Sequence, residues 1–452
     1  MSIKNLFVAA TPRFLRPYLV RVEASPLGYR FARGAFWSLM GGLTSRVLAV
    51  FASIIVARLL GKRGFGEFGI IQSTVAMFAV FAGFGMGMTS TKFVAEFRVR
   101  DPEKAGRVIL LSEVVAWTSG IIISATVYFI APWLARQTLG APQLSGVLQM
   151  GSPLLLLTGI NGAQMGALAG FESFKSIARV NLISGTAMFP LTAGGAILGG
   201  LDGTVRGLVI STVISCVVGH LTLRREAVKA GVSLNIRSWA KEWPVLWQFS
   251  LPLLIAGLMV APVNWACGAM LFSQPDGTVQ MGAFTAANQW FTALLFLPGL
   301  LGQSALPMLS ERLSMADNLR SFKLLKLSIG LNSLLVVPII ILSLASPLIM
   351  ASYGREFASD WATLCIMLLT AGLLAMQMPV GQIIIASGKI WPGLLMNTGW
   401  ALVYLLGAWL LVGQGATGLA AARLGAYILH AAWTFWYVLH LLRHHNGATG
   451  HD

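Results

Sequence analysis

Long apolar segments recur along almost the whole chain and decide which folds are open to it. A helix needs roughly 20 apolar residues to cross a bilayer core of about 30 Å, and twelve segments of the 452-residue chain reach that length. Continuous runs exclude outer-membrane barrels, whose strands alternate in polarity over about 10 residues. The sequence predicts an all-α polytopic membrane protein with about 12 transmembrane helices. The expected spans are 34–60, 67–95, 108–131, 146–170, 177–199, 204–226, 244–272, 279–305, 326–351, 360–386, 390–412 and 416–442.

The positive charge of the chain indicates its topology. The formal net charge is +16, and most of the Lys and Arg residues fall in the N-terminal segment and the loops on the same side of the membrane. The positive-inside rule places this side, and with it both termini, in the cytoplasm. Anionic membrane lipids are the expected partners of these basic loops, and no nucleic acid is expected.

The two halves of the sequence repeat each other weakly. When the chain is shifted along itself, several residues of the first half align in the same order with residues of the second. The aligned pairs are Gly66 with Gly282, Phe68 with Phe284, Asn181 with Asn397 and, after a short slip, Gly207 with Gly418. Self-similarity in constant order predicts two pseudo-symmetric six-helix halves. Parallel repeats of this kind place the substrate site of a transporter between the halves, so a central cavity is expected.

These features predict five parts of the chain. They are a cytoplasmic basic N-terminal segment (1–33), an N-terminal six-helix lobe (34–226), a cytoplasmic linker (227–243), a C-terminal six-helix lobe (244–442) and a cytoplasmic tail (443–452).

Arg46 lies near the middle of the first expected span. Inserting an arginine at such depth costs roughly 2.5 to 3.5 kcal/mol on the mildest scale. Gly42 and Ser53 share its helical face, whereas bulky residues such as Phe51 lie opposite. Arg46 is therefore expected to face protein or a water-filled cavity. Two readings stay open: a guanidinium bonded to carbonyls of a neighbouring helix, or one that faces an anionic ligand.

No carboxylate lies at a comparable depth in the sequence. Glu67, Glu113 and Glu172 come closest, each near the end of an expected span. Proton and cation relays inside membranes use Asp, Glu or His, so a buried cation without a matching acid favours an anionic ligand such as a diphosphate.

Other polar side chains inside expected spans are candidates for the cavity wall. For any single amide among them, a hydrogen bond between helices is the competing explanation. With Arg46, the candidate substrate-binding residues are Ser53, Asn161, Gln164, Arg179, Asn181, Asn264, Gln377 and Arg423.

Small residues repeat every fourth position in the fourth expected span. Gly162, Gly166 and Gly170 have the spacing that lets helices approach closely, so a packing role is expected.

Motifs of enzymes are missing from the sequence. "GKRGFG" lacks the length and the following Ser or Thr of a phosphate loop, and neither a nucleophile elbow nor a zinc-ligand spacing occurs. The sequence thus predicts neither catalytic residues nor a metal site or cofactor.

Three stretches carry a resemblance to a known family. "TSRVLAVFASIIVARLLGKRGFGEFGIIQS", "STKFVAEFR" and "GALAGFESFKSIARVNLISG" resemble the polysaccharide (O-antigen-type) flippases of the multidrug/oligosaccharidyl-lipid/polysaccharide exporter superfamily. The resemblance covers about residues 30–442. It implies alternating-access transfer of an undecaprenyl-diphosphate-linked oligosaccharide across the bacterial inner membrane. It also implies that Arg46 attracts the diphosphate or an acidic sugar, and that polysaccharide polymerases and glycosyltransferases act alongside.

Three alternatives remain at the level of sequence. The lipid II flippases also have Ser-Arg where this chain has Ser45 and Arg46, but they carry an Arg-Asp pair where it has Ala52 and Ser53, and they typically have fourteen helices. A cation-coupled multidrug exporter of the same superfamily would need an acid within the membrane. A glycan polymerase or ligase would need a large loop with catalytic groups, whereas the longest outer connection has Arg136 as its one charged residue.

Overall fold

The computed structural model describes residues 26–234, 236–299, 328–334, 336–387 and 390–444. Within these ranges the expected spans are helical apart from short interruptions, such as residues 84–85 and 258–259. Residues 1–25 of the basic N-terminal segment, residues 445–452 of the tail, and the adjoining ends of the expected spans 279–305 and 326–351 lie outside them.

The helices of the first half are long because several contain two expected spans. Gly61 (φ 69°) separates spans 34–60 and 67–95 within one helix, and Gly199 with Gly200 separates the spans of another. The helices are α3 (Pro26–Gly83), α4 (Met86–Phe97), α5 (Pro102–Trp133), α6 (Ser145–Gly151), α7 (Pro153–Gly170) and α8 (Phe174–Lys229).

The second half is also helical, with more interruptions. Its helices are α9 (Leu251–Gly257), α10 (Val260–Phe272), α11 (Gly277–Leu294), α14 (Val336–Leu344), α15 (Ser346–Tyr353), α16 (Trp361–Ala386), α17 (Ile390–Leu411) and α18 (Gly415–His444). By length and apolar composition, six described helices could cross a membrane, or seven if a bent pair counts as one span. Three of these helices carry two expected spans each, so the six described helices account for nine expected spans and the bent pair for a tenth. The expected spans 146–170 and 279–305 are not among these described helices.

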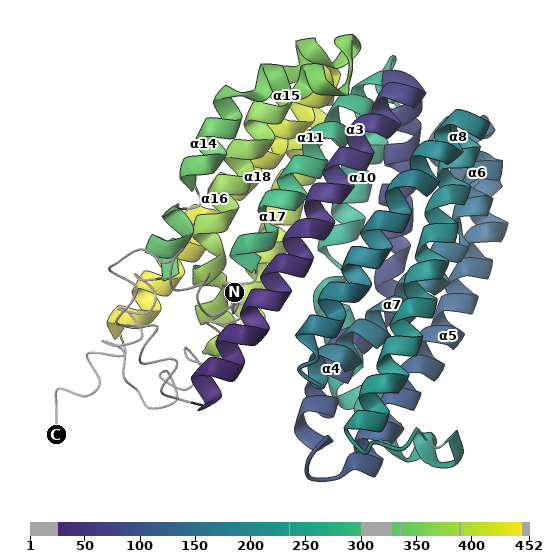
Figure 1. The fold of residues 1–452 in the computed structure, drawn as a ribbon. Coiled ribbons are helices and arrows are strands. Elements are labelled where there is room, and N and C mark those ends of the chain that lie inside the picture. Colours follow the sequence, from purple (N-terminus) through teal and green to yellow (C-terminus); the bar gives the residue numbers. More distant parts are fainter. Residues whose placement is uncertain (1–25, 235, 300–327, 335, 388–389, 445–452) are drawn as a thin grey trace, which may run out of the picture.

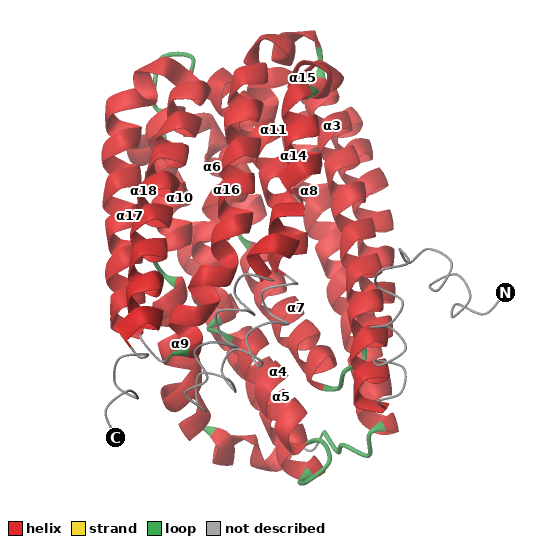
Figure 2. Cartoon of the chain, turned by 90° about the vertical axis from the view of Figure 1, so that its left-hand side faces the viewer, coloured by secondary structure: helices red, strands yellow, loops and turns green. Residues whose placement is uncertain are grey.

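The two halves lie side by side as separate groups of helices. Figure 1 shows α4–α8 on one side, α11–α18 on the other, and the first part of α3 between them. The start of α3 and the end of α18 lie at the same end of the molecule, which is the lower end in Figures 1 and 2. We call the opposite end, where α15 and the Gly61 kink of α3 meet, the distal end.

Helices α3 and α11 cross between the halves through a pair of glycines. A Cβ atom on Gly66 would lie 1.8 Å from the carbonyl oxygen of Thr278, and one on Gly282 would lie 2.2 Å from that of Lys62. Gly66 aligns with Gly282 in the sequence repeat, and Lys62 aligns with Thr278 at the same shift. The two contacts are thus equivalent, as a pseudo-twofold axis between the halves requires.

The segment that connects the halves packs on the first half. Arg107 Nε donates to Glu242 Oε1 over 2.9 Å, and Thr89 and Ser250 share a hydrogen bond of 2.8 Å. The start of the seventh expected span is therefore held against α4 and α5, although the sequence assigns it to the second half.

Candidate functional site

Arg46 projects from the middle of the first span of α3. Its side chain is exposed in the isolated chain, and its guanidinium carbon lies 5.8 Å from the ring centroid of Phe296 in the second half. Phe296 fits there because residue 42 is glycine: a Cβ atom on Gly42 would lie 1.8 Å from the Phe296 ring. In the described part of the chain, no carboxylate or carbonyl pairs with Arg46. Among the described residues, therefore, nothing competes with an anion for the guanidinium.

Arg179 and Asn181 lie on α8, which packs along the same part of α3. Gly41 of α3 contacts Ala178 so closely that a Cβ atom would lie 2.6 Å from it. Arg179 is exposed and Asn181 is half-buried. Arg179 thus places a second exposed cation on the helix next to that of Arg46.

Polar contacts join the two halves at the distal end. Ser53 Oγ and the Tyr353 hydroxyl are 3.1 Å apart, and Arg58 Nε donates to the Ser352 carbonyl over 2.6 Å. Lys62 Nζ pairs with Asp360 Oδ2 at 2.5 Å, and both side chains are almost buried. We call these contacts the distal latch. Ser53, which the sequence suggested as a substrate-binding residue, is buried in this latch.

Asn161 and Gln164 lie inside the first half. Asn161 Nδ2 donates to Ser215 Oγ over 2.8 Å, and Ser215 also bonds Ser184. Gln164 is 2% exposed and packs against Gly219. Asn161 thus makes the hydrogen bond between helices that the sequence left open for it. Gln164 packs between α7 and α8, but its Oε1 has no hydrogen-bond partner in the described chain.

Asn264 and Gln377 also bond within the second half. Asn264 Nδ2 donates to the Val260 carbonyl of its own helix over 2.7 Å. Gln377 Nε2 donates to Thr434 Oγ1 over 3.1 Å and contacts His430 Nδ1. Asn264 therefore bonds within α10, and Gln377 joins α16 to α18.

Arg423, like Arg46, has no carboxylate partner in the described chain. It is 6% exposed, and its Nη1 donates to Asn288 Oδ1 over 2.9 Å. Its guanidinium carbon lies 4.0 Å from the ring centroid of Phe291. An amide and an aromatic face stabilise this charge inside the second half.

The candidate residues therefore fall into separate groups. Arg46 and Arg179 lie on neighbouring helices, Ser53 belongs to the latch, and the remaining candidates lie within one half or the other. The sequence did not single out Lys62, Tyr353 or Asp360, because their pairing brings together parts of the chain that are far apart in sequence.

The chain has the fold of a known class of transporters. It superposes on an inward-facing multidrug resistance MATE family transporter of the MOP superfamily with a TM-score of 0.73, at 14% identity, covering 92% of this chain and 100% of the other. An outward-facing MATE family transporter gives a TM-score of 0.66, at 13% identity, with 92% and 96% coverage. The lipid II flippase MurJ, in an inward closed conformation, gives 0.68 at 15% identity, with 89% and 87% coverage.

Sequence comparison then identifies the family within this class. The model of the family described as "Polysaccharide biosynthesis protein" matches residues 31–313, and the chain belongs to this family. It is also similar to the EPS I polysaccharide export inner membrane protein EpsE of Ralstonia solanacearum, at 24% identity over 420 residues, which cover 89% of this chain and 92% of EpsE. The resemblance noted from the sequence is thereby confirmed.

Proposed function

We propose that the protein is a flippase that moves an undecaprenyl-diphosphate-linked oligosaccharide, a polysaccharide precursor, across the bacterial inner membrane. The observation that carries the proposal is Arg46, an exposed cation at mid-span with no acidic partner in the described chain. A diphosphate offers such a guanidinium several charged acceptors at once. Membership of the polysaccharide biosynthesis family and the similarity to an export protein of the inner membrane support a lipid-linked glycan as the cargo.

We also propose that transport proceeds by alternating access. The positive-inside rule puts the termini in the cytoplasm, so the distal latch closes the periplasmic side. The better superposition on an inward-facing relative than on an outward-facing one supports the same state. Residues 34–226 and 244–442 would then rock as two lobes joined by 227–243, with 1–33 and 443–452 in the cytoplasm. Polymerases and glycosyltransferases would supply and use the cargo.

Lipid II transport is the nearest alternative. The lipid II flippases resembled by the sequence carry an Arg-Asp pair where this chain has Ala52 and Ser53. These two residues are 3% and 7% exposed, so the positions are packed and offer no charge to a ligand.

A cation-coupled drug exporter is favoured by one observation, the contact of Glu113 with His220. Glu113 Oε1 lies 3.6 Å from His220 Nδ1 inside the first half, and such a pair can carry a proton. If Glu113→Gln abolished pH-driven efflux of a cationic dye by the purified protein, the exporter would replace the flippase.

The proposed function is tested by transport in proteoliposomes. Purified protein is reconstituted, and translocation of a fluorescent undecaprenyl-diphosphate oligosaccharide is compared among wild type, Arg46→Ala and Arg136→Ala. Arg136 is an exposed arginine of the distal end and serves as the matched control. We expect loss in Arg46→Ala alone. Absence of transport by wild type would reject the proposed cargo, and equal transport by Arg46→Ala would make Arg46 structural.

A further inference from the structure

The second expected span is broken inside the membrane region, where the sequence predicts a continuous helix. Phe84 and Gly85 have φ angles of 44° and 68°, which a bulky residue such as Phe rarely adopts. Irregular backbone at membrane depth is tolerated where it is buried in protein or lines a cavity. Ser119 Oγ donates over 2.7 Å to the carbonyl of Ala82, next to the break, so the surrounding structure supports this geometry.

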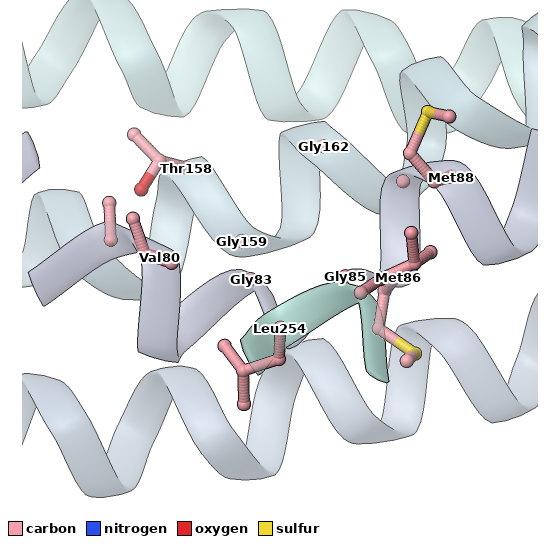
Figure 3. A pocket seen from close by; sticks show the side chains of 12 residues that line it. Val80, Gly83, Gly85, Met86, Met88, Thr158, Gly159, Gly162 and Leu254 are labelled. Atoms are coloured by element: carbon pink, nitrogen blue, oxygen red, sulfur yellow. The ribbon is translucent and has the colours of Figure 1, made fainter. Parts of the chain in front are cut away.

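A pocket of about 300 Å³ lies at this break. It is bounded by the end of α3, the start of α4, the middle of α7 and the helix α9 (Figure 3). The lining is apolar apart from Thr158, whose hydroxyl already donates to the Leu155 carbonyl. Such a pocket suits a hydrocarbon chain rather than a sugar.

Gly162 keeps the pocket open. A Cβ atom on Gly166 would lie 2.0 Å from the Gly87 carbonyl oxygen, and one on Gly170 would lie 2.7 Å from Val94 Cβ, so these two glycines serve packing. A Cβ atom on Gly162 would meet nothing within 4 Å, and Gly162 lines the pocket (Figure 3). The expected packing role therefore explains Gly166 and Gly170 but not Gly162.

Lys92 lies next to the pocket on the side of the termini. It follows the pocket residue Met88 by one turn of α4, and its Nζ lies 4.2 Å from the ring centroid of Phe249, one turn before the pocket residue Leu253. Lys92 is exposed, and in the described chain no carboxylate pairs with it. An apolar pocket with an unpaired cation beside it complements an amphiphile with a phosphate head.

We propose that this pocket binds the isoprenoid units next to the phosphate of the carrier lipid while Lys92 binds the phosphate. The proposal rests on the proposed function, which supplies the class of lipid. It adds a docking site separate from Arg46, which the carrier lipid occupies before its diphosphate reaches mid-membrane.

The test is binding of undecaprenyl phosphate without any sugar, carrying a photoreactive group on an isoprenoid unit near the phosphate. The full-length protein is purified in phosphatidylcholine nanodiscs, and crosslinking is titrated. Gly162→Leu should fill the pocket and weaken binding by about tenfold, and Lys92→Gln should weaken it by a similar factor. Gly425→Leu and Lys104→Gln are the matched controls, because Gly425 has equally open space and Lys104 lies 4.0 Å from the Phe97 ring.

Two results would overturn the site. One is unchanged binding by either Gly162→Leu or Lys92→Gln, and Lys92→Gln decides the matter if Gly162→Leu does not fold. The other is equal competition by phosphatidylglycerol, which would make the pocket a site for ordinary anionic lipid. The proposed function can fail on its own. If the wild type binds the probe but does not translocate the glycan lipid, the binding site is supported and the flippase function is rejected.

Discussion

Lys62 and Asp360 join the two halves of the molecule by an ion pair of 2.5 Å, with 9% and 13% of their side chains exposed. Removing one partner of a nearly buried pair leaves an uncompensated charge, which is strongly destabilising for the state that contains it. The closed distal end is that state, so under the proposed alternating access the pair would bias the equilibrium toward it.

We expect Lys62→Ala or Asp360→Ala to open the distal end. A cysteine introduced beside the latch should react faster with a membrane-impermeant maleimide added from the periplasmic side. The exchanged pair, Lys62→Asp with Asp360→Lys, should recover much of the wild-type protection, with a coupling energy of about 0.5 to 3 kcal/mol. Additive effects of the two single variants would show that the pair does not hold the halves together.

The close approach of α3 and α11 at Gly66 and Gly282 predicts that a larger residue at Gly66 lowers the stability of the protein. Gly66→Ala forces a methyl group to within 1.8 Å of the Thr278 carbonyl oxygen, and such overpacking costs about 1 to 3 kcal/mol. Thermal unfolding in detergent should show a lowered midpoint. Gly425→Ala, at a helical glycine with nothing within 4 Å, should leave the midpoint unchanged or raise it. Equal midpoints for both variants would contradict the close approach of α3 and α11.

Substitutions of Arg46 can separate the effect of its positive charge from the effect of its planar shape. Arg46→Lys keeps a positive charge but loses the planar group that can bind two phosphate oxygens at once. We expect Arg46→Lys to retain part of the transport rate and Arg46→Ala to lose it, measured with the same reconstituted amounts. Transport by Arg46→Lys as slow as by Arg46→Ala would instead require bidentate binding.

Arg423 should act through stability. A lysine cannot bond Asn288 while lying flat over the Phe291 ring as the guanidinium does, so Arg423→Lys should destabilise the protein by about 1 to 3 kcal/mol. Transport per folded molecule should stay close to wild type. If Arg423→Lys has the stability of the wild type but no longer transports, Arg423 is a substrate-binding residue after all.

The sequence predicted the helices better than their interruptions. Apolar runs depend on composition alone, so most of each expected span is helical where the structure describes it. The break at Phe84 and Gly85 lies inside such a run, and hydrophobicity carries no signal for a left-handed backbone angle. The glycine spacing of α7 likewise predicted close packing, but it could not show that Gly162 faces open space.

The candidate site was predicted less well, for a different reason. An arginine at mid-span is visible in the sequence because its insertion is unfavourable, and Arg46 indeed lacks an acidic partner in the described chain. The sequence does not show whether a polar amide faces a neighbouring helix or a cavity, so it could not distinguish Asn161 and Gln164 from residues that line a cavity. The latch pairs residues of different halves, and only the folded chain brings Lys62 to Asp360.

The crossing of α3 and α11 at Gly66 and Gly282 has a consequence for how such a protein can diversify. The contact is made by main-chain atoms on both sides, so its geometry does not depend on any side chain that meets the cargo. If Arg46 binds the cargo as proposed, the residues around it could be exchanged to suit another glycan without altering this crossing. Under the proposed function, recognition and mechanics would then be separable, and the chain would be a suitable scaffold for changing what is carried while keeping how it is carried.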